Sequence, residues 1–150
     1  MIRKILAFST TILLIFSSLH MIKSCSERNE TVDCFPRTHI NVMLNLNLPA
    51  YTNLQYTGGW IYVDEQSSGT RGLIVVRTAN GFKAYDRNAP HLCPSANTTL
   101  KVIEGIKIAC DNDGSEWILL TGQPTKIAKT APKTYLTNFD PLNGILTIYQ

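Results

Sequence analysis

Residues 85–117 begin with YDRNAPHLCP (85–94) and end with IKIACDNDGSEW (106–117). Each segment runs from a strand-forming stretch into a short loop that carries one cysteine, Cys93 or Cys110, and is broken by proline or glycine. This layout predicts two loops that face each other from the ends of neighbouring strands.

The sequence around these loops is typical of β-structure. Residues Ile40–Leu48 alternate between apolar and polar side chains, which indicates a half-buried strand. Leu73–Arg77 is a continuous apolar strand, and the Asn80–Gly81 pair predicts a hairpin that returns along Phe82–Asp86. Other short strands are expected at Trp60–Val63, Leu100–Ile103, Ile106–Ala109, Glu116–Thr121, Tyr135–Phe139 and Ile145–Tyr149. Because no segment keeps a helical period, the fold class is predicted to be all-β, an antiparallel sandwich or small barrel.

The N-terminal segment predicts export. Residues 1–24 have a basic start and an apolar run that is too short to span a bilayer comfortably. The residues that follow, up to Cys25, resemble a bacterial lipobox, in which the cysteine is acylated and becomes the new N-terminus. An uncleaved anchor and an ordinary signal cut nearby are the alternatives. On this interpretation, residues 1–24 are a lipoprotein signal peptide, residues 25–38 are a tether and residues 39–150 are a single β domain. The protein is then expected to be lipid-anchored in the bacterial cell envelope.

Length and charge restrict the partners of that domain. A chain of 150 residues with 44% hydrophobic residues is sufficient for one domain with a real core. The formal net charge is +3, but residues 1–24 contain Arg3, Lys4 and Lys23 and no acidic residue, so the exported part has no net charge. This balance excludes an electrostatic nucleic-acid-binding surface of the usual kind.

The order of these features, from about Gly72 to the C-terminus, resembles the Rieske iron–sulfur domain family. In that family a Cys-x-His loop and a Cys-x-x-His-Gly-Ser loop each give two ligands to a 2Fe–2S cluster. The resemblance places the four ligand positions at Ala89, His91, Cys110 and Asp113. The N-terminal strand with its repeated asparagines also resembles lipoproteins of the Bacteroidetes that carry Rieske-like domains.

Two of the four ligand positions depart from this pattern. Ala89 has no ligating atom, and Asp113 offers a hard oxygen that suits such a cluster poorly. We therefore expect that the cluster has been lost, that no cofactor is bound, and that the domain is a binding or structural module. The alternative is an electron-transfer protein in which altered ligands hold a 2Fe–2S cluster or a single metal ion, with His91, Cys93, Cys110 and Asp113 as the candidate set.

The resemblance also implies a disulfide. Rieske proteins of respiratory complexes have a disulfide between the same two loops, so the expected pair here is Cys93–Cys110, with Cys34 left unassigned. Catalytic residues are not assigned from the sequence, although an envelope enzyme using His91 and Asp113 as acid and base is a further hypothesis. The expected partners are the membrane, through lipid on Cys25, and another envelope protein.

Overall fold

The computed structural model describes residues 31–150, so the predicted signal segment and Cys25 lie outside the described residues. Within them the chain forms ten strands and one short 3-10 helix, in the order β1 (Asn41–Asn45), η2 (Pro49–Gln55), β2 (Trp60–Val63), β3 (Leu73–Thr78), β4 (Gly81–Asp86), β5 (Leu100–Ile103), β6 (Lys107–Cys110), β7 (Glu116–Ile118), β8 (Pro124–Lys126), β9 (Thr134–Asp140) and β10 (Ile145–Tyr149). In this part of the chain, no helix has the length and apolar character needed to cross a bilayer.

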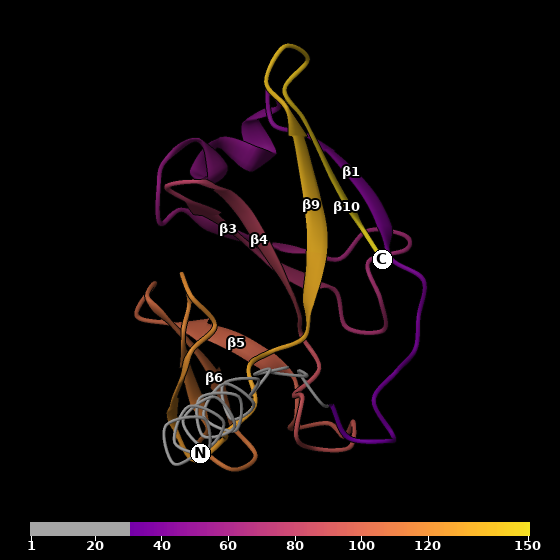
Figure 1. Ribbon diagram of the computed structural model, residues 1–150, viewed down its shortest axis with the longest axis vertical. Coiled ribbons are helices and arrows are strands. Elements are labelled where there is room, and N and C mark those ends of the chain that lie inside the picture. Colours follow the sequence, from indigo (N-terminus) through magenta and orange to yellow (C-terminus); the bar gives the residue numbers. More distant parts are fainter. Residues whose placement is uncertain (1–30) are drawn as a thin grey trace, which may run out of the picture.

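The strands form two antiparallel sheets, which confirms the predicted all-β class. One sheet has six strands in the order β1-β10-β9-β4-β3-β2, and the other has four in the order β5-β6-β7-β8. The six-stranded sheet curls, so that side chains from its β1–β10 end and from its β2–β3 end share one core. The four-stranded sheet packs below it, at the end of the molecule where the two predicted loops lie (Figure 1).

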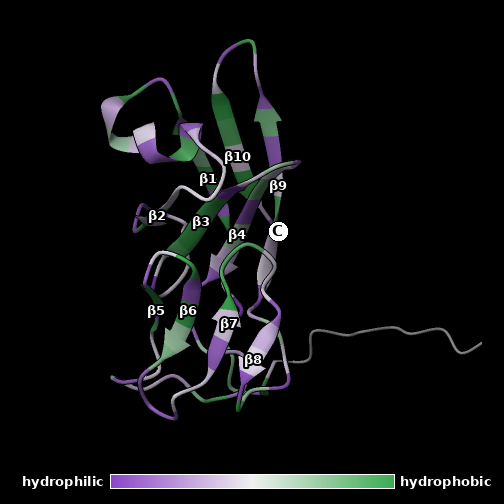
Figure 2. Ribbon diagram, turned by 90° about the vertical axis from the view of Figure 1, so that its left-hand side faces the viewer, coloured by the Kyte–Doolittle hydropathy of each residue, from purple (hydrophilic) through white to green (hydrophobic). Residues whose placement is uncertain are grey.

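Strand β3 joins the two cores of the domain. Its residues alternate in direction, so Leu73 and Val75 belong to the core inside the curled sheet, while Ile74 and Val76 belong to the core against the four-stranded sheet. All four side chains are fully buried. Burial on both faces is the reason why this strand reads as a continuous apolar run rather than an alternating one. Figure 2 shows the contrast between β3, coloured as hydrophobic, and the hydrophilic edge strand β8.

Three strand predictions need correction at their ends. Strand β1 stops at Asn45 rather than at Leu48, because the Asn45 Oδ1 atom accepts a hydrogen bond from the Asn47 amide at 3.0 Å and the chain turns there. The β3–β4 hairpin is confirmed, but Thr78 pairs with Gly81, so its turn lies one residue earlier than predicted. Strand β7 is also shorter, because the Gly122 amide donates to the Ile118 carbonyl and closes a turn.

Two elements were not predicted from the sequence. The segment after β1 contains η2, and Pro124 begins strand β8. Strand β8 lies at the edge of its sheet, where a residue without an N–H donor is tolerated.

Candidate functional site: the facing loops

The two loops meet as predicted, at the end of the four-stranded sheet. The first loop (residues 87–99) connects β4 to β5, and the second loop (residues 111–115) connects β6 to β7. Their contact is between side chains at two of the family's ligand positions: the Nε2 atom of His91 lies 2.6 Å from the Oδ2 atom of Asp113. The two side chains that the resemblance assigns to metal ligation therefore bind each other.

Ser115 completes this contact. Its hydroxyl donates to Asp113 Oδ2 at 2.6 Å and lies 3.1 Å from His91 Nε2, while its amide donates to Asp113 Oδ1 at 3.0 Å. The single hydroxyl proton goes to the carboxylate, which leaves a lone pair of Ser115 Oγ to accept from the imidazole. Ser115 is fully buried, so this hydrogen bonding occurs where little water competes.

The second loop is folded so that Asp113 can make these contacts. Its two ends are held together because the Cys110 amide donates to the Ser115 carbonyl at 3.0 Å and the Gly114 amide donates to the Cys110 carbonyl at 2.9 Å. Gly114 has a positive φ of 75°, a conformation that glycine adopts without the steric cost of a side chain. The turn therefore presents the Asp113 carboxylate towards the first loop.

The electrostatics of Asp113 favour its ionised form. Burial alone raises the pKa of this carboxyl, but the hydrogen bonds from Ser115 and from His91 outweigh burial and hold the pKa well below its usual range. An ionised Asp113 requires the facing Nε2 atom of His91 to carry a proton and donate it. The other ring nitrogen, Nδ1, is buried and has no partner among the described residues.

This arrangement differs from a Ser–His–Asp catalytic triad. In a triad the acid and the nucleophile contact opposite nitrogens of the imidazole, so that the ring can relay a proton between them. Here Asp113 and Ser115 both contact Nε2, and the Ser115 hydroxyl donates to the carboxylate rather than to the ring. The hydroxyl is therefore not activated as a nucleophile by this histidine.

The other two ligand positions face the core. Ala89 is 1% exposed and packs with Trp117 and Leu100 in the core against the four-stranded sheet. Cys110 is also 1% exposed and belongs to the same core, and burial raises the pKa of its thiol. These positions contribute apolar packing, with the Cys110 thiol held away from solvent.

The predicted Cys93–Cys110 disulfide is wrong. Cys93 pairs with Cys34, 59 residues earlier, with a Cα–Cα distance of 5.5 Å, and Cys110 is free. The physical reason is strand alternation: Ile108 and Cys110 lie two residues apart on β6, so both side chains point into the core. Cys93 is exposed at the surface of the first loop, where the N-terminal segment passes.

That segment is attached to the first loop at a second point. The Val32 amide donates to the Pro90 carbonyl at 2.9 Å, two residues before the disulfide at Cys34. Cys34 was left unassigned from the sequence. Because of these two attachments, the segment predicted to be a tether is docked onto the domain from Val32 onwards. No local signal in the sequence predicts this pairing, because it depends on where the segment crosses the surface.

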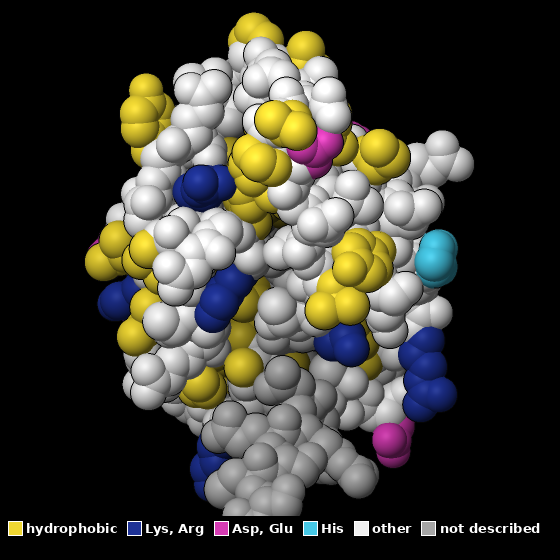
Figure 3. Space-filling view, turned by 45° about the horizontal axis from the view of Figure 1, so that its top comes forward, with side chains coloured by type: hydrophobic (Ala, Val, Ile, Leu, Met, Phe, Trp, Pro, Cys, Tyr) yellow, Lys and Arg dark blue, Asp and Glu magenta, His cyan; other side chains and the backbone are white. Residues whose placement is uncertain are grey.

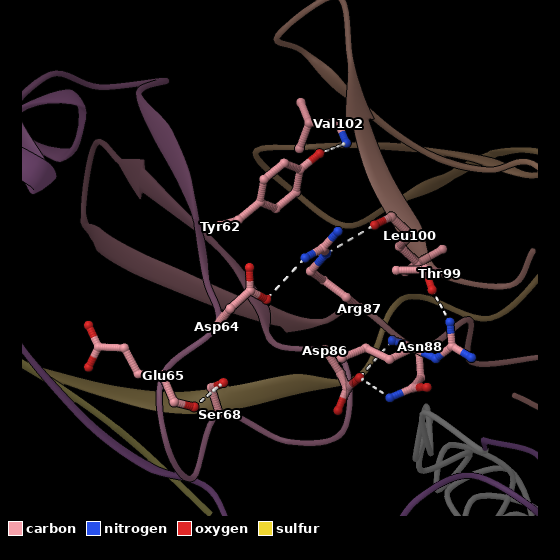
Figure 4. Close-up of polar contacts among 11 residues, drawn as sticks. Tyr62, Asp64, Glu65, Ser68, Asp86, Arg87, Asn88, Thr99, Leu100 and Val102 are labelled. Atoms are coloured by element: carbon pink, nitrogen blue, oxygen red, sulfur yellow. Dashed lines mark hydrogen bonds and ion pairs between the residues drawn. The ribbon is translucent and has the colours of Figure 1, made fainter. Parts of the chain in front are cut away.

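Residues at the base of the first loop hold it against both sheets (Figure 4). The Arg87 guanidinium pairs with Asp64 at 3.1 Å, donates to the Leu100 carbonyl at 3.3 Å, and lies 4.2 Å from the centre of the Tyr62 ring. The Tyr62 hydroxyl in turn accepts from the Val102 amide at 2.8 Å. One cation therefore connects β2 with β5 at the start of the loop.

A buried carboxylate supports the same position from the other side. Asp86 is 1% exposed, and its oxygens accept hydrogen bonds from the Asn88 amide at 2.7 Å, from the Asn88 side chain at 2.8 Å and from the Tyr135 hydroxyl at 2.6 Å. Burial, followed by the contact with Asp86, raises the pKa of Tyr135, so this tyrosine remains a donor. Arg87 and Asp86 were not predicted as supporting residues, because Asp64 and Tyr135 lie 23 and 49 residues away from them in the chain.

The residues present do not fit a 2Fe–2S cluster. Ala89 supplies no donor, the Cys110 thiol is directed into the core, and His91 and Asp113 are bonded to each other. The alternative set of His91, Cys93, Cys110 and Asp113 is not assembled either, because Cys93 is in the disulfide with Cys34. Across residues 31–150, no group of three or more His, Cys, Asp and Glu side chains is placed to hold a metal ion.

Comparison with known proteins gives similar solved structures, among them the following two. One is described as the complex of reduced oxygenase and oxidized ferredoxin in carbazole 1,9a-dioxygenase, with 17% identity and a TM-score of 0.43, covering 76% of this chain and 94% of that chain. The other is the ferredoxin of carbazole 1,9a-dioxygenase from Nocardioides aromaticivorans IC177, with 17% identity and a TM-score of 0.43, covering 75% of this chain and 97% of that chain. No protein-family model and no curated protein matches the chain.

Proposed function

We propose that this chain is an exported Rieske-like domain that has lost its 2Fe–2S cluster and acts as a binding or structural module, anchored by lipid on Cys25 in the bacterial cell envelope. The observation that carries the proposal is the 2.6 Å contact between His91 Nε2 and Asp113 Oδ2, two of the family's ligand positions. A direct bond between the loops replaces the bridge that a cluster provides in the family.

Two further features support the loss of the cluster. A thiolate ligand at position 89 is replaced by a methyl group that packs in the core, so the first loop has no sulfur at this position. The disulfide to Cys34 and the Val32–Pro90 hydrogen bond then hold the first loop from outside. The loop geometry thus depends on protein contacts, and the loss of a metal would not leave it unsupported.

The test is metal analysis and absorption spectroscopy of the full chain, purified anaerobically after expression with its N-terminal segment. We expect a colourless protein with far less than one iron per chain. Two irons per chain with the visible absorption of a 2Fe–2S centre would instead make the protein an electron carrier. A single bound metal without that absorption would favour the altered-ligand alternative, and the proposal of a metal-free module would fail.

A ligand-restored variant provides the positive control for this test. The double substitution Ala89→Cys with Asp113→His restores both family loop patterns while leaving His91 and Cys110 in place. We expect this variant, after reconstitution with iron and sulfide, to take up measurably more iron than the unmodified chain treated in the same way. Equal uptake by both proteins would show that the missing ligands at positions 89 and 113 are not what prevents cluster binding.

Lipid attachment is tested separately. We expect labelled palmitate to be incorporated by the full chain in a bacterial host and to be lost in the Cys25→Ala variant. The Cys34→Ala variant is the matched control, because Cys34 lies nine positions further along and is in the disulfide. Labelling that persists without Cys25, or that never occurs, would remove the anchor from the proposal.

A further inference from the structure

The six-stranded sheet opens at the end of the molecule opposite the loops. Strands β4 and β9 pair through only two residues each, Ala84 with Tyr135 and Tyr85 with Thr134, although β4 begins at Gly81 and β9 continues to Asp140. The Thr137 hydroxyl still donates to the Phe82 carbonyl at 3.0 Å, and beyond this bond the two strands diverge (Figure 1). We call the space between residues 79–81, at the tip of the β3–β4 hairpin, and residues 138–140 of β9 the fork.

Strand β9 presents a free backbone edge to the fork. Residues 138–140 pair with β10 on one side and have no ladder partner on the other side among the described residues. Phe82 and Thr137 lie at the base of the fork, where the Thr137 side chain already contacts the Phe82 carbonyl. Unpaired strand edges are the usual acceptor of an added strand.

The fork contains a groove of about 600 Å³ with aromatic walls. The rings of Phe82 and Phe139 line it, edge to face, with 5.2 Å between their centres. Figure 3, which brings this end of the molecule forward, shows hydrophobic side chains gathered around hollows in the surface, with basic side chains among them. Apolar side chains of a strand entering the fork would therefore find aromatic surface on its walls.

Arg77 adds a charge to this groove. Its guanidinium lies 4.4 Å from the centre of the Phe82 ring and 5.6 Å from that of Phe139. Among the described residues, this guanidinium makes neither an ion pair nor a hydrogen bond, in contrast to Arg87 and Arg71 at the other end of the domain. A stacked, partly buried guanidinium without an anionic partner is suited to bidentate binding of a carboxylate.

We propose that the fork binds an extended, acidic peptide segment of another protein. The peptide backbone adds to the free edge of β9, its apolar side chains contact Phe82 and Phe139, and an Asp or Glu side chain pairs with Arg77. The open part of β9, residues 138–140, matches a segment of about three residues, or about 10 Å of extended chain. This inference deepens the proposed binding module by naming the class of its partner.

The position of the fork agrees with this role. The described chain begins beside the first loop, where Val32 bonds to Pro90, and the fork lies at the opposite end of the molecule (Figure 1). If the chain is lipid-anchored as proposed, the six residues from Cys25 to Glu30 connect the loop end to the membrane and the fork points away from it. A segment of another envelope protein can then reach the fork without displacing the loops.

The experiment is selection of a phage-displayed library of random dodecapeptides on the full chain in detergent. The enriched sequences are then made as blocked synthetic peptides for titration. We expect peptides with an acidic residue between β-branched or aromatic residues, and amide-exchange protection within residues 138–140 when they bind. Replacing the acidic residue of the peptide by its amide should weaken binding by about tenfold or more. The Arg77→Gln variant should show the same loss, while Arg37→Gln, which changes an exposed arginine outside the groove, should not.

Three results would overturn the inference: no enriched sequence, enriched peptides that bind equally well as acid and amide, or protection that falls outside the fork. The peptide substitution leaves the protein unchanged, so it remains decisive if the Arg77→Gln variant folds poorly. Iron analysis on the same sample separates this inference from the proposed function. A protein with a cluster that still binds acidic peptides keeps the fork inference, and a cluster-free protein that binds none loses only the fork inference.

Discussion

The two ends of this domain treat their polar groups in opposite ways. At the loop end, His91, Asp113 and Ser115 bond to one another within about 3 Å, and a disulfide holds the first loop to the N-terminal segment. At the fork, the edge of β9 at residues 138–140 and the Arg77 guanidinium are left without partners in the described chain. A polar group that is already hydrogen-bonded gains little free energy by binding a ligand. An unpaired polar group beside apolar surface gains more, because the ligand supplies its missing partner. We therefore expect the binding site at the fork rather than at the family's cluster position.

The largest expected change in the free energy of unfolding follows removal of the disulfide at the loop end. Cys34 and Cys93 are separated by 59 residues, and a cross-link over this length restricts the unfolded chain by about 4 kcal/mol. We expect the Cys34→Ser/Cys93→Ser variant to lose about that much free energy of unfolding in urea, under oxidising conditions.

The control for this prediction is the unmodified protein in reductant, which should lose a similar amount, while the double variant should be insensitive to reductant. Peptide mapping without reduction should recover a Cys34–Cys93 fragment. A Cys93–Cys110 fragment would contradict the pairing and restore the family's arrangement between the loops.

A second test compares one hydroxyl at each end. Ser115 is fully buried between Asp113 and His91, whereas Thr137 is partly exposed beside the open groove. We expect Ser115→Ala to cost about 2 kcal/mol, because it removes a hydrogen bond from a buried hydroxyl to an ionised carboxylate. Thr137→Val should cost about 0.5 kcal/mol, because water in the groove can replace the lost donor to the Phe82 carbonyl. Urea unfolding of the two variants measures both values, and equal costs would remove the contrast between a closed and an open end.

A smaller effect than that of Ser115→Ala is expected for Asp113→Asn, and it depends on pH. The pKa of Asp113 is lower in the folded chain than its ordinary value, so the ionised carboxylate stabilises the fold at pH values above the unfolded pKa, about 4. This stabilisation is lost as the pH falls through the folded pKa. We expect the variant to be less stable by about 1 kcal/mol at pH 7 and at pH 5, with the difference shrinking below about pH 4.

The neighbouring substitution Asp111→Asn is the matched control for this pH dependence. Asp111 lies in the same loop but is 60% exposed and pairs with Lys101 at the surface, so its removal should change stability little. A difference for Asp113→Asn that grows as the pH falls would reverse the sign and show that Asp113 is not held ionised by its neighbours.

Several features of the site follow from local sequence. The turn residues around Asn80 and Gly114 and the apolar run at Leu73–Arg77 predicted the hairpins and the buried strand, and the structure confirms them. The resemblance placed His91 and Asp113 at facing positions, and they do meet. Turn chemistry and alternation act between residues close in the chain, so they can be read without knowing the fold.

The disulfide, the supporting residues and the fork were not predicted. Cys34 lies 59 residues from its partner, and Tyr135 lies 49 residues from Asp86, whose carboxylate it contacts. The fork exists because β9 leaves β4 beyond the Thr137–Phe82 contact, a consequence of how the sheet curls around its core.

Residue order alone was thus enough to establish that this chain forms short antiparallel strands, that two of its hairpins end in facing loops, and that Ala89 and Asp113 depart from the family's ligand pattern. Which cysteines pair, which polar groups are bonded and which strand edges stay open came from the folded arrangement. The reason is that alternation and turn formation depend on neighbouring residues, whereas these other contacts depend on distances between segments that the core packing sets.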